Sequence, residues 1–169
     1  IGPITSPVDR AMLHNLGSLV EHATQALDDY EYGRSLDLVE REFWGFCDDY
    51  LEFIKGRRYG DQGPDAAGSA NSALVAALSV YLRLLAPYLP FATEEVWSWW
   101  KTGSVHRTAW PTRQELVSAI GGVADEDLAR PPGEEGGDEG RPHVAELRVG
   151  LAALVDAQVR ELGAGDQPV

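Results

Sequence analysis

The sequence has little of what most metal-binding and secreted domains need. Its 169 residues include one cysteine, Cys47, and four histidines. A single cysteine cannot form an internal disulfide, so the composition is typical of a reducing, cytoplasmic environment. Charges interrupt every apolar run well before 18 residues, which argues against a membrane-spanning helix. No basic stretch followed by an apolar one opens the chain, so no secretory signal is predicted. Because the first residue is Ile1 rather than Met, we expect a fragment of a longer protein.

Positive charge is also scarce. The chain has 14 Lys and Arg residues against 27 Asp and Glu residues, giving a net charge of −13. A free-standing, nonspecific nucleic-acid binder would normally be basic, so that class is excluded. Residues 121–142 alone hold 7 acidic and 2 basic residues. A basic cluster can therefore exist elsewhere on the molecule, since electrostatic steering depends on local potential.

What the sequence does have is apolar residues at helical spacing. Ser6 and Pro7 suit the N-cap and first position of a helix that continues to about Tyr30. A second helix is predicted over 33–59, with Gly60 suited to end it. A third, alanine-rich and predicted to be the most buried, follows Pro64.

Prolines 87 and 90 are predicted to end that third helix. Thr93 is predicted to cap a short helix, EEVWSWW. Residues 104–111 are predicted to form an extended loop, and TRQELVSAI two or three further helical turns. No alternating strand pattern occurs, so the fold class is all-α, an elongated antiparallel helical bundle.

The sequence divides into three parts. Residues 1–120 are predicted to form the helical domain. Residues 121–142 are rich in Gly, Pro and acids and are predicted to be a flexible link. Residues 143–169 are predicted to form a C-terminal helix and a loose tail, with an apolar stripe of Val144, Leu147, Leu151, Leu154, Val155 and Val159.

No catalytic or metal-binding constellation emerges. None of the histidines follows a glutamate by three residues, as di-metal carboxylate bundles require. Asp48, Asp49 and Glu52 offer acid–base groups, but an ion-paired helix edge explains them without a cleft. Cys47 lies within the apolar period, as expected for a small buried hydrophobe. A phosphate-binding glycine loop is also missing. We therefore expect no catalytic residue, metal site or cofactor in this chain.

Binding remains as the predicted role. Lys55, Arg57 and Arg58 gather at one predicted helix end, and His106 and Arg107 lie on a loop that could fold against either end of the bundle. Cations beside aromatic rings suit unpaired RNA bases. A cluster that merely complements the helix dipole is the alternative interpretation. The tryptophans at 97, 99 and 100 are more typical of packing than of recognition.

Three ordered motifs resemble a known family. They are FWGFCDDYLE at 43–52, LAPYLPFATEEVW at 85–97 and SVHRTAWP at 104–111. They resemble the anticodon-binding domain of class I aminoacyl-tRNA synthetases, specifically valyl-tRNA synthetase. Isoleucyl and leucyl enzymes share parts of the first two motifs, and the loop at 104–106 favours the valyl enzyme.

The resemblance implies a helical bundle that binds the anticodon stem-loop of a tRNA and contacts the catalytic domain of a longer chain. The longer enzyme would join valine to tRNA with ATP and magnesium, whereas this chain alone would not. The RNA-binding candidates, chosen from charge and topology, are Lys55, Arg57, Arg58, His106 and Arg107. The alternative is a helical protein-docking domain that contacts the rest of the synthetase or another protein.

Overall fold

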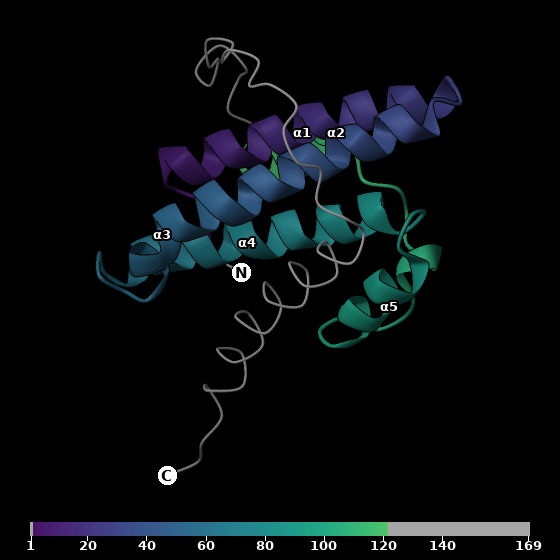
Figure 1. Ribbon diagram of the computed structural model, residues 1–169. Coiled ribbons are helices and arrows are strands. Elements are labelled where there is room, and N and C mark those ends of the chain that lie inside the picture. Colours follow the sequence, from purple (N-terminus) through teal and green to yellow (C-terminus); the bar gives the residue numbers. More distant parts are fainter. Residues whose placement is uncertain (1, 122–169) are drawn as a thin grey trace.

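The computed structural model describes residues 2–121, and within them every regular element is helical. Three long rods, α1, α2 continued through η1 and α3, and α4, lie side by side and alternate in direction (Figure 1). The predicted all-α bundle is thereby confirmed. The elements are α1 (Pro7–Asp28), α2 (Tyr32–Gly45), η1 (Phe46–Tyr50), α3 (Leu51–Arg58), α4 (Pro64–Leu85), α5 (Pro90–Ser98), η2 (Val105–Arg107) and α6 (Arg113–Ala119).

Helix α1 begins as its sequence predicts, with Ser6 at the N-cap and Pro7 in the first turn. It contacts the rest of the bundle on two sides. One side carries Leu13, Leu16 and Val20 into the core. The other side receives α6, where a Cβ atom at Gly17 would lie 3.0 Å from Cγ of Arg113. The glycine that interrupts the helical pattern therefore allows the close approach of a neighbouring helix.

The second rod is continuous but not uniform. Residues 46–50 form one π-helical segment, η1, between α2 and α3. A π-helical segment inserts a residue into the helical repeat and rotates everything after it. Phe46 and Tyr50 stack in this segment with ring centroids 5.4 Å apart. The predicted single helix over 33–59 therefore has the right extent and a local irregularity that periodicity did not indicate.

Helix α4 is the central element, as its alanine-rich sequence predicts. Most of its residues from Ser69 onward are buried, including Leu78 and Leu82. It is long and apolar enough to cross a membrane by length and composition, with a mean hydropathy of 1.2. However, 72% of the 18-residue apolar stretch of this helix is buried inside the bundle, as expected for the core helix of such a fold.

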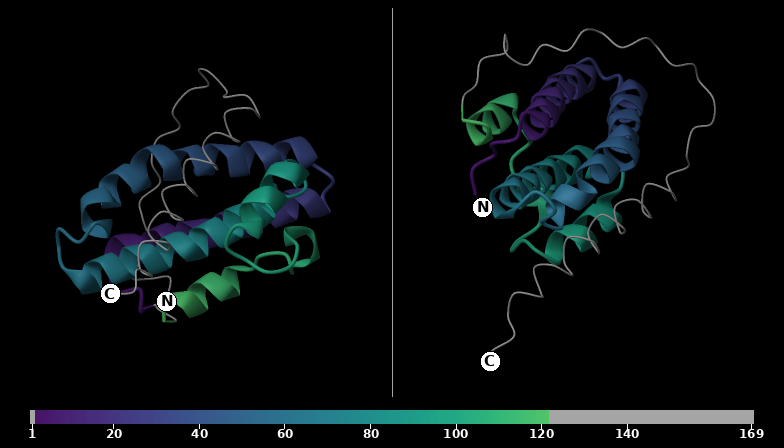
Figure 2. Two further views of the ribbon diagram at one scale, coloured as in Figure 1. Left: turned by 90° about the horizontal axis from the view of Figure 1, so that it is seen from below. Right: turned by 90° about the vertical axis from the view of Figure 1, so that its left-hand side faces the viewer.

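Beyond α4 the chain turns a corner and returns along α1 (Figure 2). Helix α5 begins at Pro90, so the predicted capping by Thr93 is wrong: its hydroxyl lies inside the helix and donates to the carbonyl of Leu89 at 2.9 Å. The loop at 104–111 contains the single turn η2. Trp110 anchors it by donating to Thr24 Oγ1 on α1 at 2.9 Å.

The predicted short helix after this loop is α6, which Thr112 caps by accepting from the Glu115 amide. Arg113 of α6 donates to Glu21 of α1 at 2.8 Å. The predicted flexible link at 121–142, apart from Gly121, and the predicted C-terminal helix and tail at 143–169 lie outside the described residues. Those two predictions stay predictions.

Candidate nucleic-acid interface

Helix α3 ends in a basic turn. Its last turn contains Lys55, Arg57 and Arg58, and the chain then reverses at Gly60, whose φ is +95°. The left-handed conformation is one that only glycine adopts without strain, so the predicted helix end at Gly60 is confirmed. The amide of Gly60 donates to the carbonyl of Arg57 at 3.1 Å and closes the last turn. Three cations thus occupy four consecutive positions of one helical turn.

Arg57 points into the protein. Its guanidinium forms a two-pronged ion pair with Asp9 of α1, and the two side chains are 8% and 0% exposed. The same carboxylate accepts from Tyr50 Oη and from Ser69 Oγ, each at 2.7 Å. The hydrogen bonds that Arg57 donates to Asp9 raise the pKa of Arg57 above its usual value. Arg57 therefore links α3 to α1 and is not oriented to contact RNA.

Lys55 and Arg58 lie at the surface of the same turn. The ammonium of Lys55 donates to Glu52 at 3.2 Å, and both side chains are mostly exposed. Arg58 donates to Asn71 of α4 at 3.3 Å, and its guanidinium carbon lies 6.0 Å from the centre of the Tyr59 ring. Tyr59 itself is 63% exposed. The α3 end, meaning Lys55, Arg58 and Tyr59, thus presents two cations beside one accessible ring.

His106 and Arg107 occupy η2, which packs against α5 and the last part of α4. Nε2 of His106 lies 3.0 Å from the carbonyl oxygen of Pro90. Glu94 fixes the loop because its carboxylate accepts from the Val105 amide at 2.9 Å and from Ser104 Oγ at 3.0 Å. Both basic side chains of η2 are exposed.

The five predicted residues do not form one surface. Arg58 contacts α4 near its beginning, at Asn71, whereas η2 lines a small pocket with Ala86 just past the end of α4. At 1.5 Å per residue, those two positions on α4 are roughly 22 Å apart. Figure 1 shows α3 and α5 at opposite ends of the bundle. The structure thus brings Lys55 and Arg58 together, places Arg57 beneath them, and puts His106 and Arg107 at the other end.

Sequence reasoning missed Asp9, the residue that explains Arg57. Asp9 lies in the first turn of α1, where an acid is ordinarily explained as complementing the helix dipole. Yet Asp9 precedes Leu13 by four residues and Leu16 by seven, which places it on the buried face. Arg57 follows Tyr50 by seven residues, so the two side chains lie on the same face of their helix. An acid on the buried face of α1 and a cation on the same face as Tyr50 are together the signal that could have revealed the pair.

The other candidate groups contribute to packing and to surface ion pairs. Glu52 pairs with Lys55, as the ion-paired helix edge predicts. Cys47 is half-buried against the core, and burial together with Asp48 raises the pKa of its thiol to about 12. Trp97 is buried and Trp100 packs against the core, whereas Trp99 is 45% exposed. Within residues 2–121, no group of three or more His, Cys, Asp or Glu side chains is placed to hold a metal ion.

Comparison with known families agrees with this architecture. Residues 9–131 match the family model described as the anticodon-binding domain of tRNA ligase. The chain belongs to this family. The matched range begins at Asp9 and includes the α3 end, η2 and α6, so both basic ends of the bundle lie inside the family domain.

Several curated relatives are valine–tRNA ligases. The protein from Salinispora arenicola is 48% identical over 160 residues, which is 95% of this chain and 18% of that protein. The Salinispora tropica protein is 56% identical over 68% of this chain, and that of Cutibacterium acnes is 56% identical over 71%. The chain spans 13% to 18% of the length of these three relatives. It corresponds to one domain-sized part of a much longer enzyme.

Proposed function

We propose that this chain is the part of a valine–tRNA ligase that binds the anticodon stem-loop of its tRNA. The observation that carries the proposal is the position of the α3 end within a domain of the anticodon-binding family. Lys55 and Arg58 supply charge for phosphates, and Tyr59 supplies a ring on which an unpaired base can stack.

Electrostatics favours a local contact over a broad one. Several cations of the described residues are already in ion pairs, such as Arg34 with Glu31 and Arg113 with Glu21. A nonspecific grip on the phosphate backbone is therefore not supported. The binding that remains is a small interface of few phosphates plus stacking, with a modest dependence on salt.

Arg57 takes a supporting role in this proposal. Its ion pair with Asp9 holds the last turn of α3 against α1 and so fixes the direction in which Arg58 and Tyr59 leave the bundle. His106 and Arg107 form a second candidate contact at the other end. A stem-loop that reached both would have to extend along the bundle for roughly 20 Å.

The remaining properties concern the longer protein. We infer that it joins valine to tRNA with ATP and magnesium, that it works in the cytoplasm, and that this domain contacts its catalytic part. The described residues provide no donor set for magnesium. ATP and the metal would therefore be bound by other parts of that enzyme, and this chain would contribute RNA recognition.

The test is binding of fluorescently labelled anticodon stem-loops, one cognate for valine and one with a changed anticodon, as a function of salt. The Lys55→Ala/Arg58→Ala variant should bind about tenfold more weakly and reduce the slope of log affinity against log salt by roughly 1.5 to 2. Tyr59→Ala should weaken binding with an unchanged slope, because stacking carries no charge.

A matched control removes the same charge elsewhere. Arg34→Ala/Arg41→Ala lowers the net charge by two through exposed side chains of α2. It should leave affinity within about twofold, because charges beyond a Debye length are screened. Equal losses in both double variants would mean that only net charge matters. If only the His106→Ala/Arg107→Ala variant lost affinity for the stem-loop, the interface would lie at η2 and not at the α3 end.

A further inference from the structure

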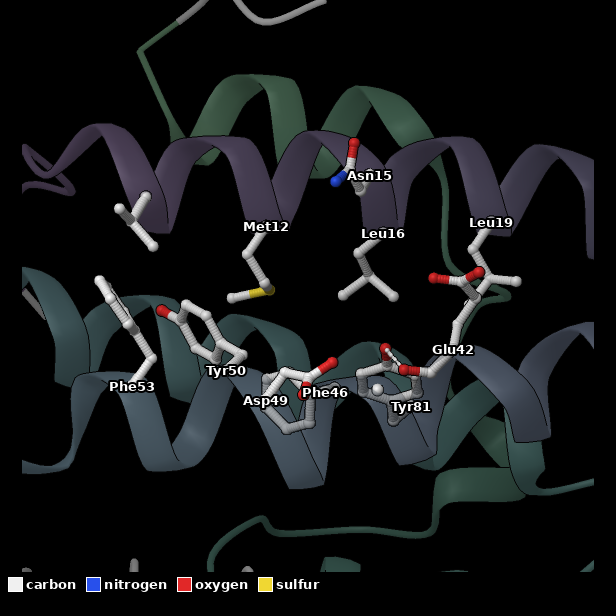
Figure 3. A pocket seen from close by; sticks show the side chains of 12 residues that line it. Met12, Asn15, Leu16, Leu19, Glu42, Phe46, Asp49, Tyr50, Phe53 and Tyr81 are labelled. Carbon is white, nitrogen blue, oxygen red and sulfur yellow. Dashed lines mark hydrogen bonds between the residues drawn. The ribbon is translucent and has the colours of Figure 1, made fainter. Parts of the chain in front are cut away.

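A groove opens between α1 and the second rod. It is remote from η2, and at its other end it reaches Phe53 of α3, two residues before Lys55. It has a volume of about 420 Å³. Met12, Leu16 and Leu19 point into it from α1, opposite Phe46 and Tyr50 (Figure 3). Two further apolar side chains at its mouth are open to solvent, Val8 at 39% and Phe53 at 71% exposure. Exposed phenylalanine beside a hydrophobic groove is typical of a surface that another segment covers.

The shape of the groove fits one amphipathic helix. Along α1 it extends from Val8 to Leu19, which at 1.5 Å per residue is roughly 16 Å, or three helical turns. Tyr81 of α4 lies at the groove as well, and the acids Glu42 and Asp49 line it (Figure 3). An occupant therefore needs an apolar stripe of about three turns with a basic residue beside it.

We propose that residues 143–162 of this same chain dock in the groove as a helix. Their sequence carries an apolar stripe from Val144 to Val159, which as a helix would be roughly 22 Å long. Arg148 flanks that stripe directly after Leu147, in position to face the acidic rim. This inference concerns an intramolecular contact and does not depend on the proposed RNA binding.

The connection is long enough. The described chain ends just past α6, which lies on the other side of α1 from the groove (Figures 2 and 3). Residues 122–142 supply a connection of up to about 70 Å when extended, far more than the width of one helix. A tethered segment also has an effective concentration in the millimolar range, so a weak contact is sufficient.

The length of chain beyond the described residues and the place where it begins are the reasons for choosing this segment over an external partner. A second copy of the chain and another segment of the longer synthetase are the competing occupants. Both would leave residues 143–162 away from the groove.

The test is hydrogen–deuterium exchange, measured by mass spectrometry on the full 169-residue chain. In the wild type, amides of 143–162 should exchange at least about tenfold more slowly than in an unfolded chain. Leu151→Asp should abolish this protection, because it places a charge on the apolar stripe. The matched control is Ala153→Asp, which adds the same charge two residues later on the opposite helical face and should retain protection.

Variants of the groove complete the test. Val8→Asp and Phe53→Asp alter exposed side chains and leave the core intact, so circular dichroism should be unchanged. Both should release residues 143–162 as Leu151→Asp does. Unprotected amides in the wild type would overturn the inference, as would protection that neither groove variant changes. Protection that disappears on dilution would assign the groove to a second copy and overturn it equally.

Discussion

The buried ion pair between Arg57 and Asp9 leads to the sharpest prediction about this protein. Arg57→Ala would remove the guanidinium and leave the Asp9 carboxylate at 0% exposure without its countercharge. Within residues 2–121, the remaining side-chain donors to it would be the hydroxyls of Tyr50 and Ser69. Removing one partner of a buried ion pair costs about 3 to 5 kcal/mol, because the other charge remains desolvated. Arg57→Ala should lower the free energy of unfolding by that amount.

The neighbouring residue is the natural control. Arg58 has the same side chain and lies one position further along, but it is only half-buried, donates to Asn71 and lies beside the exposed Tyr59 ring. Arg58→Ala should cost less than about 1 kcal/mol, as most surface substitutions do. Two arginines of equal charge and adjacent position thus have predicted effects that differ by about 2 kcal/mol or more.

The assay is urea unfolding followed by circular dichroism, with the midpoint and the slope fitted for each variant. The double variant Asp9→Asn/Arg57→Met should recover part of the loss, because no uncompensated charge stays buried. If Arg57→Ala and Arg58→Ala destabilised the protein equally, or if Arg57→Ala cost less than about 1 kcal/mol, the assignment of Arg57 to a buried network would be refuted.

Two smaller predictions follow from single residues. With its pKa raised to about 12, the Cys47 thiol should be alkylated by iodoacetamide at pH 8 roughly a thousandfold more slowly in the native protein than in urea, since only the thiolate reacts. Reaction at the unfolded rate would contradict its burial. Tyr30 is exposed and has a φ of +61°, so Tyr30→Gly should raise the free energy of unfolding by about 0.5 to 1 kcal/mol in the same urea assay. A loss of stability there would show that the Tyr30 ring contact with Tyr32 outweighs the strain.

The helices were predictable because their sequence signals are local. Ser6 and Pro7 start α1, Pro64 starts α4 and Gly60 ends α3, all as the cap preferences predict. The start of α5 was not, because Thr93 and Pro90 both offer valid start signals and Pro90 prevails. Proline suits the first turn because it has no N–H to leave unpaired there. Starting at Pro90 also adds backbone hydrogen bonds that a helix starting after Thr93 would lack.

The candidate site was harder to predict because it depends on which way each basic side chain points from its helix. Arg57 and Arg58 follow the buried Ile54 by three and four residues, so helical spacing from Ile54 alone cannot separate them. The π-helical segment η1 adds a further rotation that sequence period does not reveal. The position of η2, beside α3 or at the other end of the bundle, is decided by its tertiary contacts. The loop is tied to Pro90 and Glu94, and no local signal encodes that choice.

If the α3 end binds the anticodon loop, RNA must change the environment of its amides, and chemical-shift mapping measures this directly. Titrating a cognate stem-loop into isotope-labelled protein should shift the amides of residues 55–60 and leave those of 105–107 in place. The same titration with the Lys55→Ala/Arg58→Ala variant should need about tenfold more RNA to produce the same shifts in residues 55–60. Shifts confined to η2, or no shift at either end with RNA in excess, would contradict the claim.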